Sequence, residues 1–192
     1  MKHLHVIRWA ALGGLLLTPL AALAVGGPMS GWTGAYVGAQ AGLNNVSSDQ
    51  TSSENAVTLG LLGGYDAQVS DHFVLGGDVF YNWNRKKDHS IDNCIGPCTT
   101  NYGTNVYGVD LRLGFPIGTS GGIMPYVKGG YGRANGTGDL SGDSNAWRYG
   151  AGIEFRPGDF LGLTLQYMHQ NFGSDSDDLT NDNYTVGVNF HF

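Results

Sequence analysis

Tyr184-Thr185-Val186-Gly187-Val188-Asn189-Phe190-His191-Phe192 ends the chain, and apolar and polar side chains alternate along it without a break. Alternation with a period of two is typical of a β-strand that has one apolar and one polar face. The apolar face of this strand would carry Tyr184, Val186, Val188, Phe190 and Phe192. The final nine residues therefore predict a strand whose two faces meet different environments.

The same alternation recurs in seven earlier segments. We expect strands over residues 33–44, 55–69, 73–84, 103–115, 123–134, 145–156, 160–172 and 183–192. The short connections at 70–72, 116–122 and 157–159 are rich in turn-forming residues, whereas those at 45–54, 85–102, 135–144 and 173–182 are long and polar. Short and long connections in alternation predict an up-and-down barrel with an even number of strands.

Charged residues on the polar faces indicate which face points inward. They are four acids and four bases: Asp66, Asp78, Asp110, Glu154, Arg112, Lys128, Arg148 and Arg156. Each basic side chain that faced lipid near the bilayer midplane would cost about 2 to 4 kcal/mol. The charges must therefore point into the barrel, and the apolar faces must meet lipid.

Aromatic residues on the apolar faces gather at both strand ends. One group lies near the long connections (Tyr81, Trp83, Tyr107, Trp147, Tyr149, Tyr184) and the other near the short turns (Tyr65, Phe73, Phe115, Phe155, Phe190, Phe192). Two such girdles are typical of chains that cross a bilayer. The pattern predicts an all-β fold, an eight-stranded antiparallel up-and-down transmembrane β-barrel with short periplasmic turns and long extracellular loops.

The first 24 residues differ from the rest. Lys2 and Arg8 precede an apolar run, and Ala22-Leu23-Ala24 matches a cleavage site, so we expect residues 1–24 to be a cleaved signal peptide and 25–192 the barrel domain. Removing Lys2 and Arg8 from the 10 basic residues leaves 8 against 16 acidic ones, a formal charge of −8. Such a charge excludes nucleic acid as a partner.

Several stretches, taken in order, resemble the small outer-membrane β-barrel proteins related to the OmpA membrane domain, within which many surface antigens carry the label "porin family". They are residues 31–38 (GWTGAYVG), 63–65 (GGY), 73–78 (FVLGGD), 166–173 and 184–192. The resemblance implies a Gram-negative outer-membrane location, contact with outer-membrane lipids and lipopolysaccharide, and insertion by the assembly machinery. That machinery reads a last strand ending in Phe, which makes Tyr184, Phe190 and Phe192 the expected assembly signal.

The resemblance implies no reaction, and we expect neither an enzyme nor a cofactor. The favoured function is a membrane-anchored structural, surface-exposed protein whose loops bind an extracellular ligand, with the lumen charges forming a network that fixes strand register. The first alternative is a narrow pore, for which interior glycines would keep space open (Gly38, Gly42, Gly60, Gly64, Gly108, Gly150, Gly152). The second is a lipid-directed enzyme using His169, although Asn171 stands where a nucleophilic Ser would be useful.

Two features of the long connections suggest further sites. Cys94 and Cys98 are the only cysteines, and in an oxidising compartment they would form a disulfide at the loop tip. A metal site there would need His89 and Asp92 as well. Acidic residues could hold a divalent cation or simply be solvated, namely Asp139, Asp143, Asp175, Asp177, Asp178 and Asp182.

Overall fold

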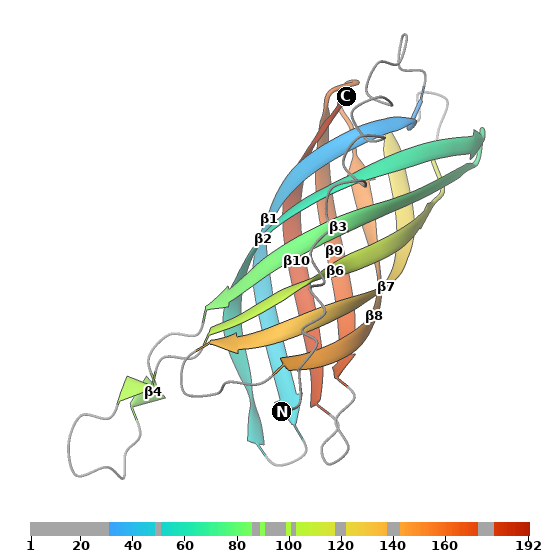
Figure 1. Ribbon diagram of the computed structural model, residues 1–192. Coiled ribbons are helices and arrows are strands. Elements are labelled where there is room, and N and C mark those ends of the chain that lie inside the picture. The colour runs from blue at the N-terminus through green and yellow to red at the C-terminus, as the bar shows by residue number, and fades with distance from the viewer. Residues whose placement is uncertain are drawn as a thin grey trace, which may run out of the picture.

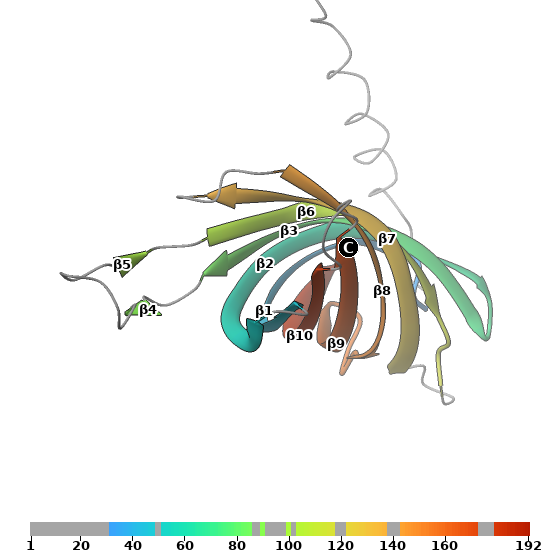
Figure 2. The ribbon, with the colours of Figure 1, turned by 90° about the horizontal axis from the view of Figure 1, so that it is seen from below.

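The computed structural model describes residues 31–48, 51–85, 89–90, 99–100, 103–117, 122–137, 143–172 and 179–192. Eight antiparallel strands form one closed barrel around a tilted axis (Figures 1 and 2). They are β1 (Gly34–Ser48), β2 (Thr51–Ser70), β3 (Phe73–Arg85), β6 (Gly103–Gly114), β7 (Ile123–Thr137), β8 (Asp143–Phe155), β9 (Leu161–Phe172) and β10 (Leu179–His191). Each pairs with its neighbours along the chain, and β10 closes onto β1, which confirms the predicted up-and-down topology.

Several strands run further than predicted at the end of the barrel that carries connections 49–50, 86–102, 138–142 and 173–178, called here the long-loop end. β1 and β2 remain paired as far as Ser48 and Thr51, so the predicted long connection over 45–54 is wrong. Apolar alternation marks only the part of a strand that meets lipid. Asn, Ser and Thr continue the backbone ladder equally well, because each carries the same N–H and C=O groups.

The connection between β3 and β6 contains two short strands that the sequence pattern does not predict. β4 (His89–Ser90) and β5 (Thr99–Thr100) pair antiparallel and lie outside the barrel wall (Figure 1). Two-residue strands leave too few positions for an alternating pattern to be recognised.

The outer surface of the barrel is apolar, as the alternation predicts. Along β10 the outward-facing Tyr184 and Val186 are more than half exposed, whereas Thr185 between them is only 4% exposed. Aromatic rings pack across neighbouring strands at both ends: Tyr81 and Tyr107 stack at the long-loop end, and the rings of Phe73 and Phe115 meet edge to face at the short-turn end. The lipid-facing belt is thus bounded by two aromatic girdles.

The described residues include no helix of the length and hydropathy that crosses a membrane.

Candidate functional sites in the lumen and at the rim

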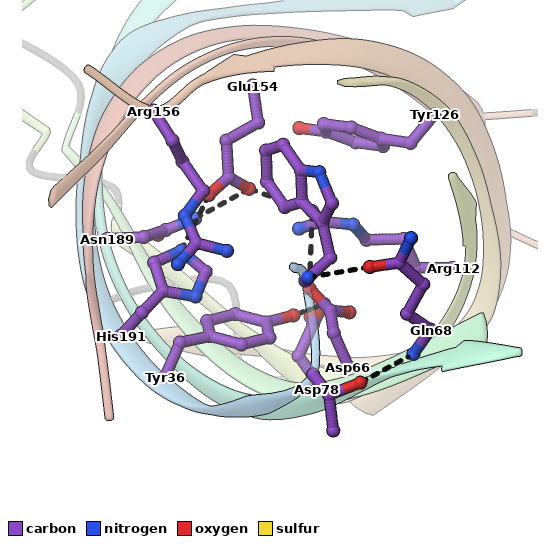
Figure 3. Close-up of polar contacts among 12 residues, drawn as sticks. Tyr36, Asp66, Gln68, Asp78, Arg112, Tyr126, Glu154, Arg156, Asn189 and His191 are labelled. Carbon is purple, nitrogen blue, oxygen red and sulfur yellow. Dashed lines mark hydrogen bonds and ion pairs between the residues drawn. The ribbon is translucent and has the colours of Figure 1, made fainter. Parts of the chain in front are cut away.

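The eight charged residues singled out in the sequence all lie inside the barrel and are buried. One group is centred on Arg112 of β6. Its Nη2 lies 2.8 Å from Glu154 Oε2 on β8 and 3.3 Å from Asp66 Oδ2 on β2 (Figure 3). Glu154 also accepts hydrogen bonds from His191 Nε2 (2.6 Å) and Asn189 Nδ2 (3.3 Å), both on β10. This Arg112 group therefore links β2, β6, β8 and β10 across the lumen.

A second group is centred on Lys128 of β7. Its Nζ lies 2.6 Å from Asp78 Oδ2 on β3 and 3.4 Å from Asp110 Oδ2 on β6. Tyr36 of β1 donates a hydrogen bond to Asp78 (3.0 Å), and Arg148 Nε forms an ion pair with Asp110 Oδ1 at 3.1 Å. The Lys128 group joins the odd-numbered strands β1, β3 and β7 to β6 and β8.

Glycines make room for these charges. Asp66 and Asp110 are paired across the sheet with Gly76 and Gly130, and a Cβ at either glycine would collide with the carboxylate of its partner. The seven interior glycines named above do not keep space open, and that expectation is wrong. A Cβ at any of them would come within 3.0 Å of a neighbouring atom, because side chains or backbone of adjacent strands already lie over them.

Arg156 occupies a different place from the other seven charges. None of the ion pairs among the described residues includes it. Its guanidinium lies 4.6 Å from the ring centre of Trp32 and donates to the backbone oxygens of Gly31 (3.3 Å) and Asp159 (2.6 Å). Arg156 lies at the short-turn end, where its guanidinium is within hydrogen-bond distance of backbone carbonyls.

Trp32 closes the short-turn end from inside. Its backbone N–H donates to Gln68 Oε1 (3.0 Å), and its ring packs in an apolar cluster with Val74 and Met124. Gly31, immediately before it, has a φ of 84°, which a residue with a side chain rarely adopts. In the sequence this segment indicates only the family resemblance, because the alternation of a β-strand starts after it.

The lumen nearer the long loops is filled by neutral side chains. Gln40 Nε2 donates to Asn82 Oδ1 (2.8 Å), and Thr58 Oγ1 donates to Asn84 Oδ1 (2.6 Å). The same half also holds an apolar cluster on β3, β6, β7, β8 and β9, made of Phe80, Val106, Ala134, Ala146 and Phe172. This half of the lumen holds no ion pair among the described residues.

His169 of β9 lies on the outward face, at the level of the aromatic girdle of the long-loop end. Its Nδ1 is 2.7 Å from Asp182 Oδ1 on β10, and Tyr167 donates to the same oxygen at 2.7 Å. The ring of Tyr149 lies 5.1 Å away on β8. Within the described chain no hydroxyl or thiol is hydrogen-bonded to the His169 ring, and Asn171 follows two residues on.

The last strand places Tyr184, Phe190 and Phe192 outward, each at least 39% exposed. The Phe192 N–H donates to the Ala35 carbonyl oxygen at 2.8 Å, and the rings of Phe190 and Phe192 lie beside Phe160. The backbone end of β10 is thus held against β1, while its aromatic side chains remain on the lipid face.

The remaining predicted sites fall mostly outside the described residues. These are the cleavage residues Ala22 and Ala24, the cysteines Cys94 and Cys98, and the acids Asp139, Asp175, Asp177 and Asp178. Of the other loop acids, Asp182 contacts His169 and Asp143 pairs with Arg133. The described part of the chain contains no group of three or more His, Cys, Asp or Glu residues that could hold a metal ion.

A closed antiparallel barrel with a charged lumen, a lipid-facing belt and two aromatic girdles defines a transmembrane β-barrel. Residues 10–192 match the family model described as "Outer membrane protein beta-barrel domain", and the chain belongs to that family. It is a protein of the bacterial outer membrane. The short-turn end is therefore the periplasmic end, and the long-loop end is extracellular.

Two solved structures show the same fold. Neisserial surface protein A (NspA) is 18% identical, with a TM-score of 0.64 over 85% of this chain and 100% of that chain. Ail, the attachment invasion locus protein of Yersinia pestis, is 17% identical, with a TM-score of 0.57 over 83% of this chain and 99% of that chain. Ail has also been solved in complex with the heparin analogue sucrose octasulfate. A comparison with curated protein sequences gives no significant match.

Proposed function

We propose that this small outer-membrane barrel is a rigid, non-conducting frame that presents its extracellular loops to partners. The observation that carries the proposal is the filled lumen. Two groups of buried ion pairs cross it, Trp32 closes its periplasmic end, and neighbouring atoms cover its interior glycines. Eight strands enclose a space just wide enough for side chains to fill.

The two ion-pair groups would also set the strand register. Arg112 and Glu154 lie on strands separated by β7, and Glu154 and His191 lie on strands separated by β9. A slip of one residue in any of these strands would turn its charged side chain toward lipid. Contacts between second-neighbour strands therefore penalise wrong registers that the backbone ladder alone would accept.

The extracellular loops are the parts left free for recognition, since rigid scaffolds commonly carry function on loops. In the sequence, the four connections over 49–50, 86–102, 138–142 and 173–178 carry seven acidic residues and two basic ones, Lys86 and Lys87. A strongly sulfated ligand such as the one bound to Ail would be repelled by this balance. We therefore propose partners that are neutral or cationic rather than polyanionic.

Conductance in planar bilayers tests the closed frame. Protein whose folding is verified by the gel shift between unboiled and boiled samples should give no discrete current steps. Steps that change in size on Arg112→Ala or Glu154→Ala would establish the pore instead. For the loops, retention on a heparin column at physiological salt is expected to be absent, and retention would refute the charge argument.

We do not extend the proposal to catalysis. His169 has an orienting carboxylate in Asp182, but a hydrolase also needs a nucleophile within hydrogen-bond reach. Lipid mass spectrometry of cells with the wild-type protein and with His169→Ala should show identical lipids. A lipid species that disappears with His169→Ala would restore the enzyme alternative.

A further inference from the structure

The outward surface at the extracellular end of β8, β9 and β10 carries a cluster of polar and aromatic side chains that takes no part in the contacts inside the lumen. This rim cluster consists of His169, Asp182, Tyr167, Tyr149 and Trp147. We propose that the rim cluster binds the saccharide part of an outer-leaflet glycolipid, with His169 Nε2 accepting a hydrogen bond from a sugar hydroxyl.

The contacts of Asp182 fix the direction of the imidazole. An ionised carboxylate only accepts hydrogen bonds, so His169 must donate from Nδ1–H, as Tyr167 does from its hydroxyl. In the neutral ring the proton on Nδ1 leaves a lone pair on Nε2. No described residue is hydrogen-bonded to that atom. The cluster therefore presents an oriented acceptor that the protein itself does not satisfy.

The depth of the cluster places this acceptor among lipid headgroups. His169 is paired directly with Tyr149 on one side and with Asp182 on the other, and Tyr167 is paired with Tyr184 one step nearer the membrane centre. These aromatic residues belong to the extracellular girdle, where rings sit at headgroup level. A polar group exposed at that depth needs a partner from water or from a headgroup.

The chemistry of the cluster favours a sugar over a phosphate. Asp182 places a carboxylate that is one-third exposed beside the acceptor, and this negative charge would repel a phosphate oxygen. Sugar hydroxyls instead offer the donor that Nε2 lacks. Trp147 and Tyr149 lie on the neighbouring strand β8, and their rings are 71% and 60% exposed. These rings offer flat apolar surfaces against which the apolar faces of a sugar can pack.

Binding of three lipids to detergent-purified protein tests the proposal. The probes are lipopolysaccharide, dephosphorylated lipopolysaccharide and phosphatidylglycerol, which separate sugar from phosphate. His169→Ala should weaken both lipopolysaccharide forms about five- to tenfold, the effect of losing one hydrogen bond with its supporting contacts. Binding of phosphatidylglycerol should change less than about twofold. His72→Ala, in the exposed turn at the periplasmic end, is the matched control and should change neither.

Two further variants separate the proposal from a loss of structure. Asp182→Asn removes the carboxylate that holds the proton on Nδ1, so the proton can move to Nε2, and most of the loss of lipopolysaccharide binding should be reproduced. His169→Gln keeps an amide oxygen as acceptor and should recover part of that binding. All variants must show the wild-type gel shift. An equal loss for phosphatidylglycerol would make the cluster a phosphate contact, and unchanged lipopolysaccharide binding in a folded His169→Ala protein would remove the site. Either result overturns the proposal.

Discussion

Replacing Arg112 by Ala should destabilise the barrel more than any single change at an exposed charge. Arg112 is 3% exposed and contacts two carboxylates that are fully buried, Asp66 and Glu154. Its guanidinium also lies over the ring of Tyr126, 4.4 Å from the ring centre. Ala removes the cation and leaves both buried acids without it.

The expected cost follows from what each acid retains. Breaking a buried ion pair by deleting one partner costs about 3 to 5 kcal/mol, because the remaining charge is unpaired. Glu154 keeps its hydrogen bonds from His191 and Asn189, whereas Asp66 loses its only ion pair among the described residues. Most of the penalty therefore falls on Asp66, and we expect a loss near the lower end, about 3 kcal/mol.

Urea unfolding in lipid vesicles measures this loss as a change in the free energy of unfolding. Arg133→Ala is the matched control, since Arg133 and its partner Asp143 form an ion pair that is about half exposed and worth about 0 to 1 kcal/mol. Adding Asp66→Asn to Arg112→Ala should restore about half of the loss by removing the unpaired charge. If Arg112→Ala lost no more unfolding free energy than Arg133→Ala, or if the double variant recovered none of it, the ion pairs of the Arg112 group would not stabilise the barrel in this way.

Two further changes test the packing of the lumen and the role of the last residue. Gly152→Ala places a Cβ 2.5 Å from the hydroxyl of Tyr126 and should cost about 1 to 3 kcal/mol in the same urea assay. Gly129→Ala, whose Cβ has no neighbour nearer than 4.0 Å, should cost much less, and equal costs would contradict the filled lumen. Phe192→Ala should lower the amount of folded protein in outer-membrane fractions at least severalfold, as a defect in assembly, whereas Phe73→Ala in the same girdle should not. Normal levels for Phe192→Ala would remove the assembly role and leave the barrel unaffected.

The eight barrel strands and the direction of their faces could be predicted from the sequence because lipid and lumen impose opposite demands on alternate residues. Leu111 and Arg112 illustrate this: they are neighbours, yet the first is 71% exposed and the second is 3% exposed. Where charged residues occur only at every second position, the bilayer tolerates only the arrangement in which that face of the strand points into the lumen. The strand ends could not be predicted equally well, since pairing past the lipid belt depends on backbone groups that every residue has.

The partners of the lumen charges could not be predicted, because they depend on how the barrel closes. Alternation turns Tyr36 and His191 inward but does not reveal that they complete the ion-pair groups. These contacts join strands that are not neighbours, and the stagger between strands determines which side chains meet at one level. The partners of Arg156 could not be predicted either, because it follows the last residue of β8 and its guanidinium donates to the backbone oxygens of Gly31 and Asp159.

The first and last strands each supply hydrogen-bond donors to a carboxylate two strands away. His191 and Asn189 of β10 donate to Glu154 on β8, and Tyr36 of β1 donates to Asp78 on β3. Without β10, Glu154 would lack both donors, and without β1, Asp78 would lack the Tyr36 hydroxyl. A carboxylate that loses such partners inside the membrane is costly. The contacts that fill the lumen thus favour the complete barrel over a sheet that lacks either terminal strand.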